Sequence, residues 1–116
     1  MSASQASALN AIAFQLLAAL EAYEGELETL VRVPDDLELY QRVSQRVDEM
    51  RRYAAALPMV SVAWVEVLIR HFELTHCLWK RQSRVSELTA VQDCLDRMRE
   101  PLARLQQMCR RVLTTT

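Results

Sequence analysis

The sequence predicts an all-α domain, a four-helix up-down-up-down antiparallel bundle with heptad-type packing, and three observations favour it. One glycine and three prolines among 116 residues are too little turn material for a fold of many strands. Apolar residues recur at alternating spacings of four and three, as in helices that pack along one stripe. Hydrophobic residues make up 51% of the chain, which is enough for one core. Residues 1–116 are therefore expected to form a single domain.

The first expected helix covers residues 2–32. Ser2 with Gln5 three residues later is typical of a capping box. The apolar stripe that follows consists of Leu9, Ala13, Leu16, Leu20, Tyr23, Leu27 and Leu30. Gly25 lies inside the helix, where glycine costs about 1 kcal/mol relative to alanine. It marks either a weak point or, as we favour, the close approach of another helix. Pro34 ends the helix because the residue before a proline disfavours the α conformation.

The second and third expected helices are bounded by prolines and polar caps. Asp35, with Glu38 three residues later, is expected to cap the second helix. Its stripe runs up to Pro58 and consists of Tyr40, Val43, Val47, Met50, Ala54 and Leu57. The third helix is expected to begin near Ser61, whose hydroxyl can accept a hydrogen bond from an early amide, and to end between residues 81 and 83.

The fourth expected helix begins near Ser86. Its stripe consists of Leu88, Val91, Leu95, Met98, Leu102, Leu105, Cys109 and Val112. Pro101 removes one backbone hydrogen bond from this helix. Because the stripe continues in phase beyond it, we expect Pro101 to kink the helix without ending it. The three closing threonines are expected to fray.

Charge and composition exclude several classes of function. The net charge is −1, but residues 1–49 carry nine acids and three bases whereas residues 50–116 carry six acids and eleven bases. The two halves therefore attract each other, and no unopposed basic face is left for a nucleic acid. No basic residue precedes the apolar run at residues 8–20, which is also too short for a membrane span. We expect neither a targeting signal nor a membrane partner.

The cysteines and the basic residues indicate the cellular localisation of the chain. Cys77, Cys94 and Cys109 are odd in number and have no Cys-x-x-Cys spacing, so the sequence suggests neither a disulfide framework nor a zinc cluster. A reducing cytosol fits this pattern. Thirteen arginines against one lysine hint at a GC-rich bacterial genome. The expected localisation is therefore the bacterial cytoplasm.

The third helix carries more apolar surface than a bundle helix needs. On a helical wheel its charged residues occupy an arc of only about 80°, and the apolar arc covers about 220°. Either this helix is central and wrapped by the other three, or the edge formed by Val65, Ile69, Phe72 and Trp79 is exposed and binds a helix of another protein or of a second copy. We favour the second interpretation. It makes the domain a protein-interaction module: a small adaptor, a regulator or a secretion-type chaperone.

His76 is the strongest candidate for a residue with a chemical role. The run Thr75-His76-Cys77-Leu78-Trp79-Lys80 resembles the histidine phosphotransfer domains of bacterial signalling, which are also helical bundles. The resemblance covers fewer than ten residues and implies that His76 is a phosphoacceptor. The lysine comes one residue later than in that family, and the glycine after it is absent. A divergent phosphotransfer domain is therefore one alternative function, and a structural homodimer subunit is another.

The remaining polar residues indicate no catalytic or metal site. His71 lies in the middle of the apolar arc, where a core histidine with one internal hydrogen bond is expected. Glu73 and His76 form one Glu-x-x-His pair, but a di-iron bundle needs two such pairs. The sequence has no nucleophile elbow and no phosphate-binding loop. We therefore expect no enzyme activity, no metal, no cofactor and no small-molecule ligand.

Overall fold

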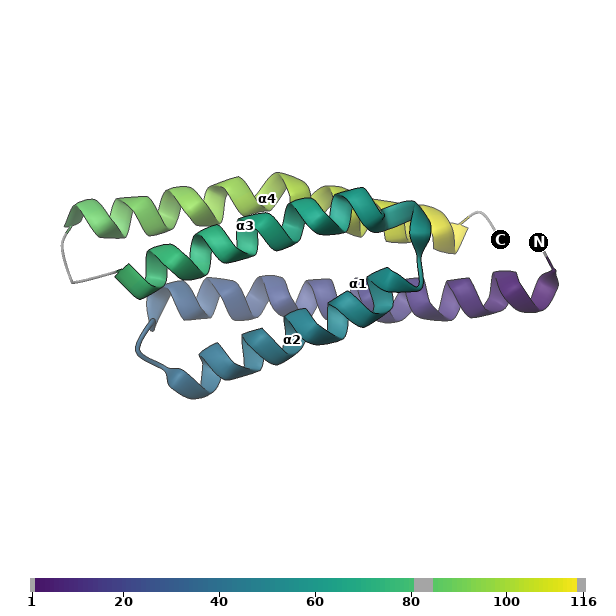
Figure 1. Ribbon diagram of the computed structural model, residues 1–116, viewed down its shortest axis with the longest axis horizontal. Helices are drawn as coiled ribbons and strands as arrows, with labels where there is room; N and C mark the ends of the chain where they lie inside the picture. The colour runs from purple at the N-terminus through teal and green to yellow at the C-terminus, as the bar shows by residue number, and fades with distance from the viewer. Residues whose placement is uncertain (1, 81–84, 115–116) are drawn as a thin grey trace.

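The computed structural model describes residues 2–80 and 85–114, and these residues form four helices (Figure 1). Helix α1 spans Ala3–Arg32, α2 spans Leu37–Ala55, α3 spans Ser61–Lys80 and α4 spans Val85–Thr114. A short 3-10 helix, η1, spans Pro58–Val60 and leads directly into α3. The described residues contain no strand, so the predicted all-α class is confirmed.

The helix starts show how local chemistry sets the boundaries. The predicted capping box is present: the amide of Gln5 donates to Ser2 Oγ over 3.2 Å, and the amide of Ser2 donates to Gln5 Oε1 over 3.0 Å. The predicted cap of α2 is wrong by one residue. The Asp36 amide donates to the carbonyl of Val33 over 3.1 Å, so Asp35 lies in a turn. Asp36 caps the helix instead, and its Oδ1 accepts from the amide of Leu39 over 3.0 Å.

Helix α1 and helix α4 lie at the centre of the contact pattern. Helix α1 packs against α2 on one side and α4 on the other, and α4 packs against α3. Helix α2 contacts α3 far less, because the chain turns by 120° between Leu37–Ala55 and Pro58–Lys80. Figure 1 shows this divergence and places the start of α1 and the end of α4 at the same end of the molecule. Helix α3 is thus held mainly by one neighbour.

The core contains most of the predicted stripe residues. Those buried to 2% exposure or less include Leu16, Leu20, Tyr23, Leu27, Leu30, Met50, Leu57, Met98, Leu102 and Leu105. Leu9, Tyr40 and Val112 are only partly buried. The side chain of Leu88 lies outside the described residues. Helix α4 is described as far as Thr114, and the two threonines after it also lie outside the described part.

The predictions for Pro101 and Gly25, two residue types that disfavour helix interiors, have different outcomes. Helix α4 continues through Pro101, whose ring is buried, as the in-phase stripe predicted. The expectation that Gly25 marks a close approach of another helix is wrong. Gly25 is exposed, and a Cβ atom added there would meet nothing within 4 Å. The glycine faces outward because the stripe of α1 turns its Tyr23 and Leu27 inward.

Candidate partner interface

The four residues predicted to bind a partner are all exposed on α3. Val65 is 50% exposed, Ile69 53%, Phe72 56% and Trp79 81%. The other tryptophan of this helix, Trp64, is only 7% exposed and belongs to the core. Helix α3 is therefore not wrapped on all sides by its own chain, which was the competing interpretation of its wide apolar arc.

Two further residues complete this exposed row. Val62 is 84% exposed and His76 is exposed as well. With them the row reads Val62, Val65, Ile69, Phe72, His76 and Trp79, at spacings that alternate between three and four. We call these six residues the outer seam. Sequence reasoning missed Val62 and His76 as members, although the alternating spacing was a signal that could have found them.

Helix α3 has apolar surface on two opposite faces. Its buried residues are Ala63, Trp64, Val67, His71, Leu74 and Leu78. On a wheel of 100° per residue their mean direction and that of the outer seam differ by about 160°. One face is sufficient to attach a helix to a bundle. The second face has the 3-4 repeat of a helix that packs against another helix.

A row of ion pairs lies between the outer seam and α4. Arg104 Nη1 contacts Glu66 Oε2 over 3.1 Å, and Arg97 Nη1 contacts Glu73 Oε2 over 3.6 Å. Arg70 Nη1 also donates to Glu73 Oε1 over 2.8 Å. The carboxylates of Glu66 and Glu73, next to the seam, are therefore already paired with arginines of the chain itself. A partner would contact the seam mainly through apolar side chains.

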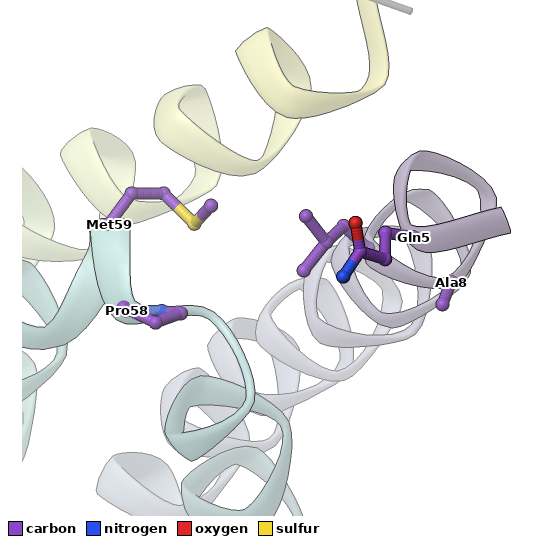
Figure 2. A pocket seen from close by; sticks show the side chains of 5 residues that line it. Gln5, Ala8, Pro58 and Met59 are labelled. Carbon is purple, nitrogen blue, oxygen red and sulfur yellow. The ribbon is translucent and has the colours of Figure 1, made fainter. Parts of the chain in front are cut away.

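A second apolar surface lies between the start of α1 and η1. It is an open groove of about 610 Å³ lined by Gln5, Ala8, Leu9, Pro58 and Met59. Figure 2 shows Pro58 and Met59 on one side of this groove and Gln5 and Ala8 on the other. Sequence reasoning missed it, because the groove exists only once two segments some fifty residues apart lie together.

His71 is buried in the core, as predicted. It is 5% exposed, and its Nδ1 lies 2.7 Å from the hydroxyl oxygen of Tyr23 in a buried hydrogen bond between α3 and α1. Burial lowers the pKa of His71 to about 4 and raises the pKa of Tyr23, since both charged forms lose hydration. The pair is therefore neutral near pH 7 and holds the two helices together.

The cysteines make one contact that the sequence did not predict. Cys94 and Cys109 are buried, as expected of small core residues. The Sγ atom of Cys77 on α3, however, lies 2.8 Å from that of Cys94 on α4. Sequence spacing carried no signal for this pair, because the contact depends on the register between two helices. Among the described residues no group of three or more His, Cys, Asp or Glu side chains could hold a metal ion.

Helix α1 passes a simple test for a membrane span. Ala3–Arg32 is long and apolar enough by length and composition to cross a membrane, and 22% of its most apolar 18-residue window is buried. A mostly buried core helix of a soluble protein and a signal sequence near the N-terminus meet the same criterion. The segment expected to be too short for a membrane span covered residues 8–20 alone. Alanines and uncharged polar residues before it lengthen the uncharged segment toward the N-terminus. In the structure this helix contributes Leu16, Leu20 and Tyr23 to the core.

Comparison of the chain with protein-family models, with curated proteins and with solved structures gave no match. Two surfaces of the molecule, the outer seam and the groove, are unusual for a helical domain. The outer seam is the more informative of the two. It is a regular helical pattern of six residues, whereas the groove is an irregular opening at the end of the bundle.

Proposed function

We propose that the domain is a non-enzymatic protein-interaction module of the bacterial cytoplasm, acting as an adaptor, regulator or secretion-type chaperone. In this proposal the outer seam of α3 packs against an amphipathic helix of a partner protein. One observation carries the proposal: five large apolar residues and His76 form a 3-4 repeat along an exposed helix face, opposite to the face that holds the helix in its own core.

The chemistry of the outer seam suits a helical partner. A repeat of this kind accepts the side chains of a facing helix as knobs into holes, which is how helix-in-groove and helix-on-helix recognition operate. Phe72 and Trp79 are the two aromatic residues of the seam, and aromatic anchors contribute much of the binding energy in such interfaces. The partner helix is expected to carry its own apolar repeat over about five turns.

We also propose a finer arrangement for the scaffold that presents the seam. The four helices would form an up-down-up-down antiparallel bundle with heptad-type packing, and α4 would bend at Pro101. The contacts of α1 with α2 and α4, and of α3 with α4, support this topology. Heptad packing on the inner side of α3 would keep the outer seam continuous, because both rows follow the same 3-4 repeat.

Site-specific photo-crosslinking in the source organism tests the proposal. A photoreactive phenylalanine analogue at Ile69, in the middle of the seam, is expected to form a covalent adduct with a different protein. The same analogue at Gln45, an exposed residue of α2, is the matched control and is expected to give none. A second substitution, Phe72→Asp, is expected to weaken the adduct at least tenfold, because an unpaired carboxylate would be buried against the partner.

The alternatives give different results in the same experiment. An adduct of twice the chain mass, together with a concentration-dependent mass in sedimentation equilibrium, would identify a homodimer subunit. Equal crosslinking from residues 45 and 69, or none from either, would contradict the role of the outer seam.

A divergent phosphotransfer domain remains a second candidate, favoured by one observation. His76 is exposed, as a phosphoacceptor must be. It lies, however, between Phe72 and Trp79 in an apolar row. Incubation with phosphoramidate, which transfers a phosphoryl group directly to an imidazole nitrogen, is therefore expected to give no label on His76. Label that disappears in His76→Ala would establish the phosphotransfer function instead.

A further inference from the structure

The sulfur atoms of Cys77 and Cys94 lie close enough to react with each other. Their Sγ atoms are 2.8 Å apart, whereas a disulfide bond is about 2.05 Å long. The two residues come from α3 and α4, which have the most extensive contact of any helix pair in the described part of the chain. Closing the remaining distance therefore requires a shift of less than about 1 Å within one packed pair of helices.

We propose that Cys77 and Cys94 form a reversible disulfide that links α3 to α4, with a low-molecular-weight disulfide such as oxidised glutathione as the oxidant. This site is independent of the partner-binding function proposed above. Cys77 is partly exposed and can meet the oxidant, whereas Cys94 is buried and can meet only Cys77. The third thiol, Cys109, is buried and lies 15 residues further along α4.

The reaction balances as two thiol–disulfide exchanges. The thiolate of Cys77 attacks one sulfur of the oxidant, which forms a mixed disulfide and releases the first small thiol. The thiolate of Cys94 then attacks Cys77 Sγ, which forms the internal bond and releases the second small thiol. The protein loses two protons and two electrons, and the oxidant is reduced to two thiols.

The surroundings of Cys94 set the rate of the second exchange. Loss of hydration, the contact with Cys77 and the negative charge of Glu73 raise the pKa of Cys94 to about 11. The guanidinium of Arg97, whose Nη2 lies 3.7 Å from Cys94 Sγ, acts in the opposite direction. The thiolate is the nucleophile, and burial, the largest of these causes, persists in the mixed disulfide. The closing step is therefore expected to accelerate as the pH rises from 7 to 9.

The bond would change the stability of the fold. It closes a loop of 17 residues between α3 and α4 and so restricts the unfolded chain. For a loop and a domain of this size the expected rise in Tm is roughly 10 °C. The linked segment contains Trp79, so oxidation would also fix the last turns of the outer seam against α4.

Thiol counting on the full chain tests this inference. After incubation with oxidised glutathione at pH 8.5 and alkylation of the unfolded protein, mass spectrometry is expected to find one alkylated cysteine, Cys109. Three are expected after treatment with dithiothreitol. Thermal unfolding followed by circular dichroism is expected to show the higher Tm in the oxidised sample only.

Three variants keep the test decisive. Cys109→Ser is expected to oxidise like the wild type. Cys94→Ser is expected to retain a glutathione adduct on Cys77. Cys77→Ser is expected to form neither a glutathione adduct nor an internal disulfide. Circular dichroism confirms that each variant is folded. Three free thiols in the oxidised wild type, a persistent glutathione adduct on wild-type Cys77, or a disulfide between two chains would each overturn the proposal.

Discussion

Lowering the pH from 7 to 5 is expected to reduce the free energy of unfolding by about 2 kcal/mol through His71 alone. In the folded protein burial lowers the pKa of His71 to about 4, whereas the unfolded chain binds a proton near pH 6.5. The unfolded state therefore binds more protons between these two values. The stability contributed by neutral His71 is complete above about pH 6.5 and is lost as the pH falls toward 4, with a total of about 3 kcal/mol.

The variant His71→Gln is the control for this pH dependence. Glutamine does not titrate, and its amide oxygen can still accept a hydrogen bond from the buried Tyr23 hydroxyl. Urea unfolding of both proteins at pH 7 and pH 5 gives the two losses, and the loss in the variant is expected to be about 2 kcal/mol smaller. Equal losses in the two proteins would show that the folded and unfolded chains bind protons equally at His71, and so that burial does not lower its pKa.

The hydrogen bond of this histidine also shows what the sequence could predict. A histidine in the middle of an apolar arc was expected to be buried with one internal partner, and the contact with Tyr23 confirms it. The identity of the partner could not be predicted, because it depends on how α1 and α3 are aligned. The same limit explains the Cys77–Cys94 contact and the groove at Met59. Each of them joins elements that are distant in the sequence.

The properties of a single helix could be predicted from the sequence more fully than contacts between helices. The arc of charges on the third helix predicted an exposed apolar edge, and the exposures of Val65, Ile69, Phe72 and Trp79 agree with it. Periodicity within one helix depends only on backbone geometry, so it can be determined without knowing the neighbours. The function of that edge depends on a molecule outside the chain and therefore stays a proposal. The prediction for Gly25 was wrong although the same periodicity places this residue opposite the stripe that contains Tyr23 and Leu27.

A matched pair of substitutions on α3 is expected to separate folding from function. Leu74 is fully buried, whereas Ile69, five residues before it, is 53% exposed. Leu74→Ala removes three buried carbon atoms and leaves a cavity, so it is expected to reduce the free energy of unfolding by about 3 kcal/mol. Ile69→Ala is expected to change it by less than about 0.5 kcal/mol, because a surface substitution creates no cavity and alanine favours the helix.

Urea unfolding of the purified chain measures both effects, and photo-crosslinking at a neighbouring seam position measures the partner adduct. Leu74→Ala is expected to be less stable, but its folded molecules are expected to keep the outer seam intact and to form the adduct. Ile69→Ala is expected to keep its stability and to weaken the adduct. If Ile69→Ala costs as much stability as Leu74→Ala, the outer seam belongs to the core of the chain itself. In that case its apolar residues need no partner to explain them.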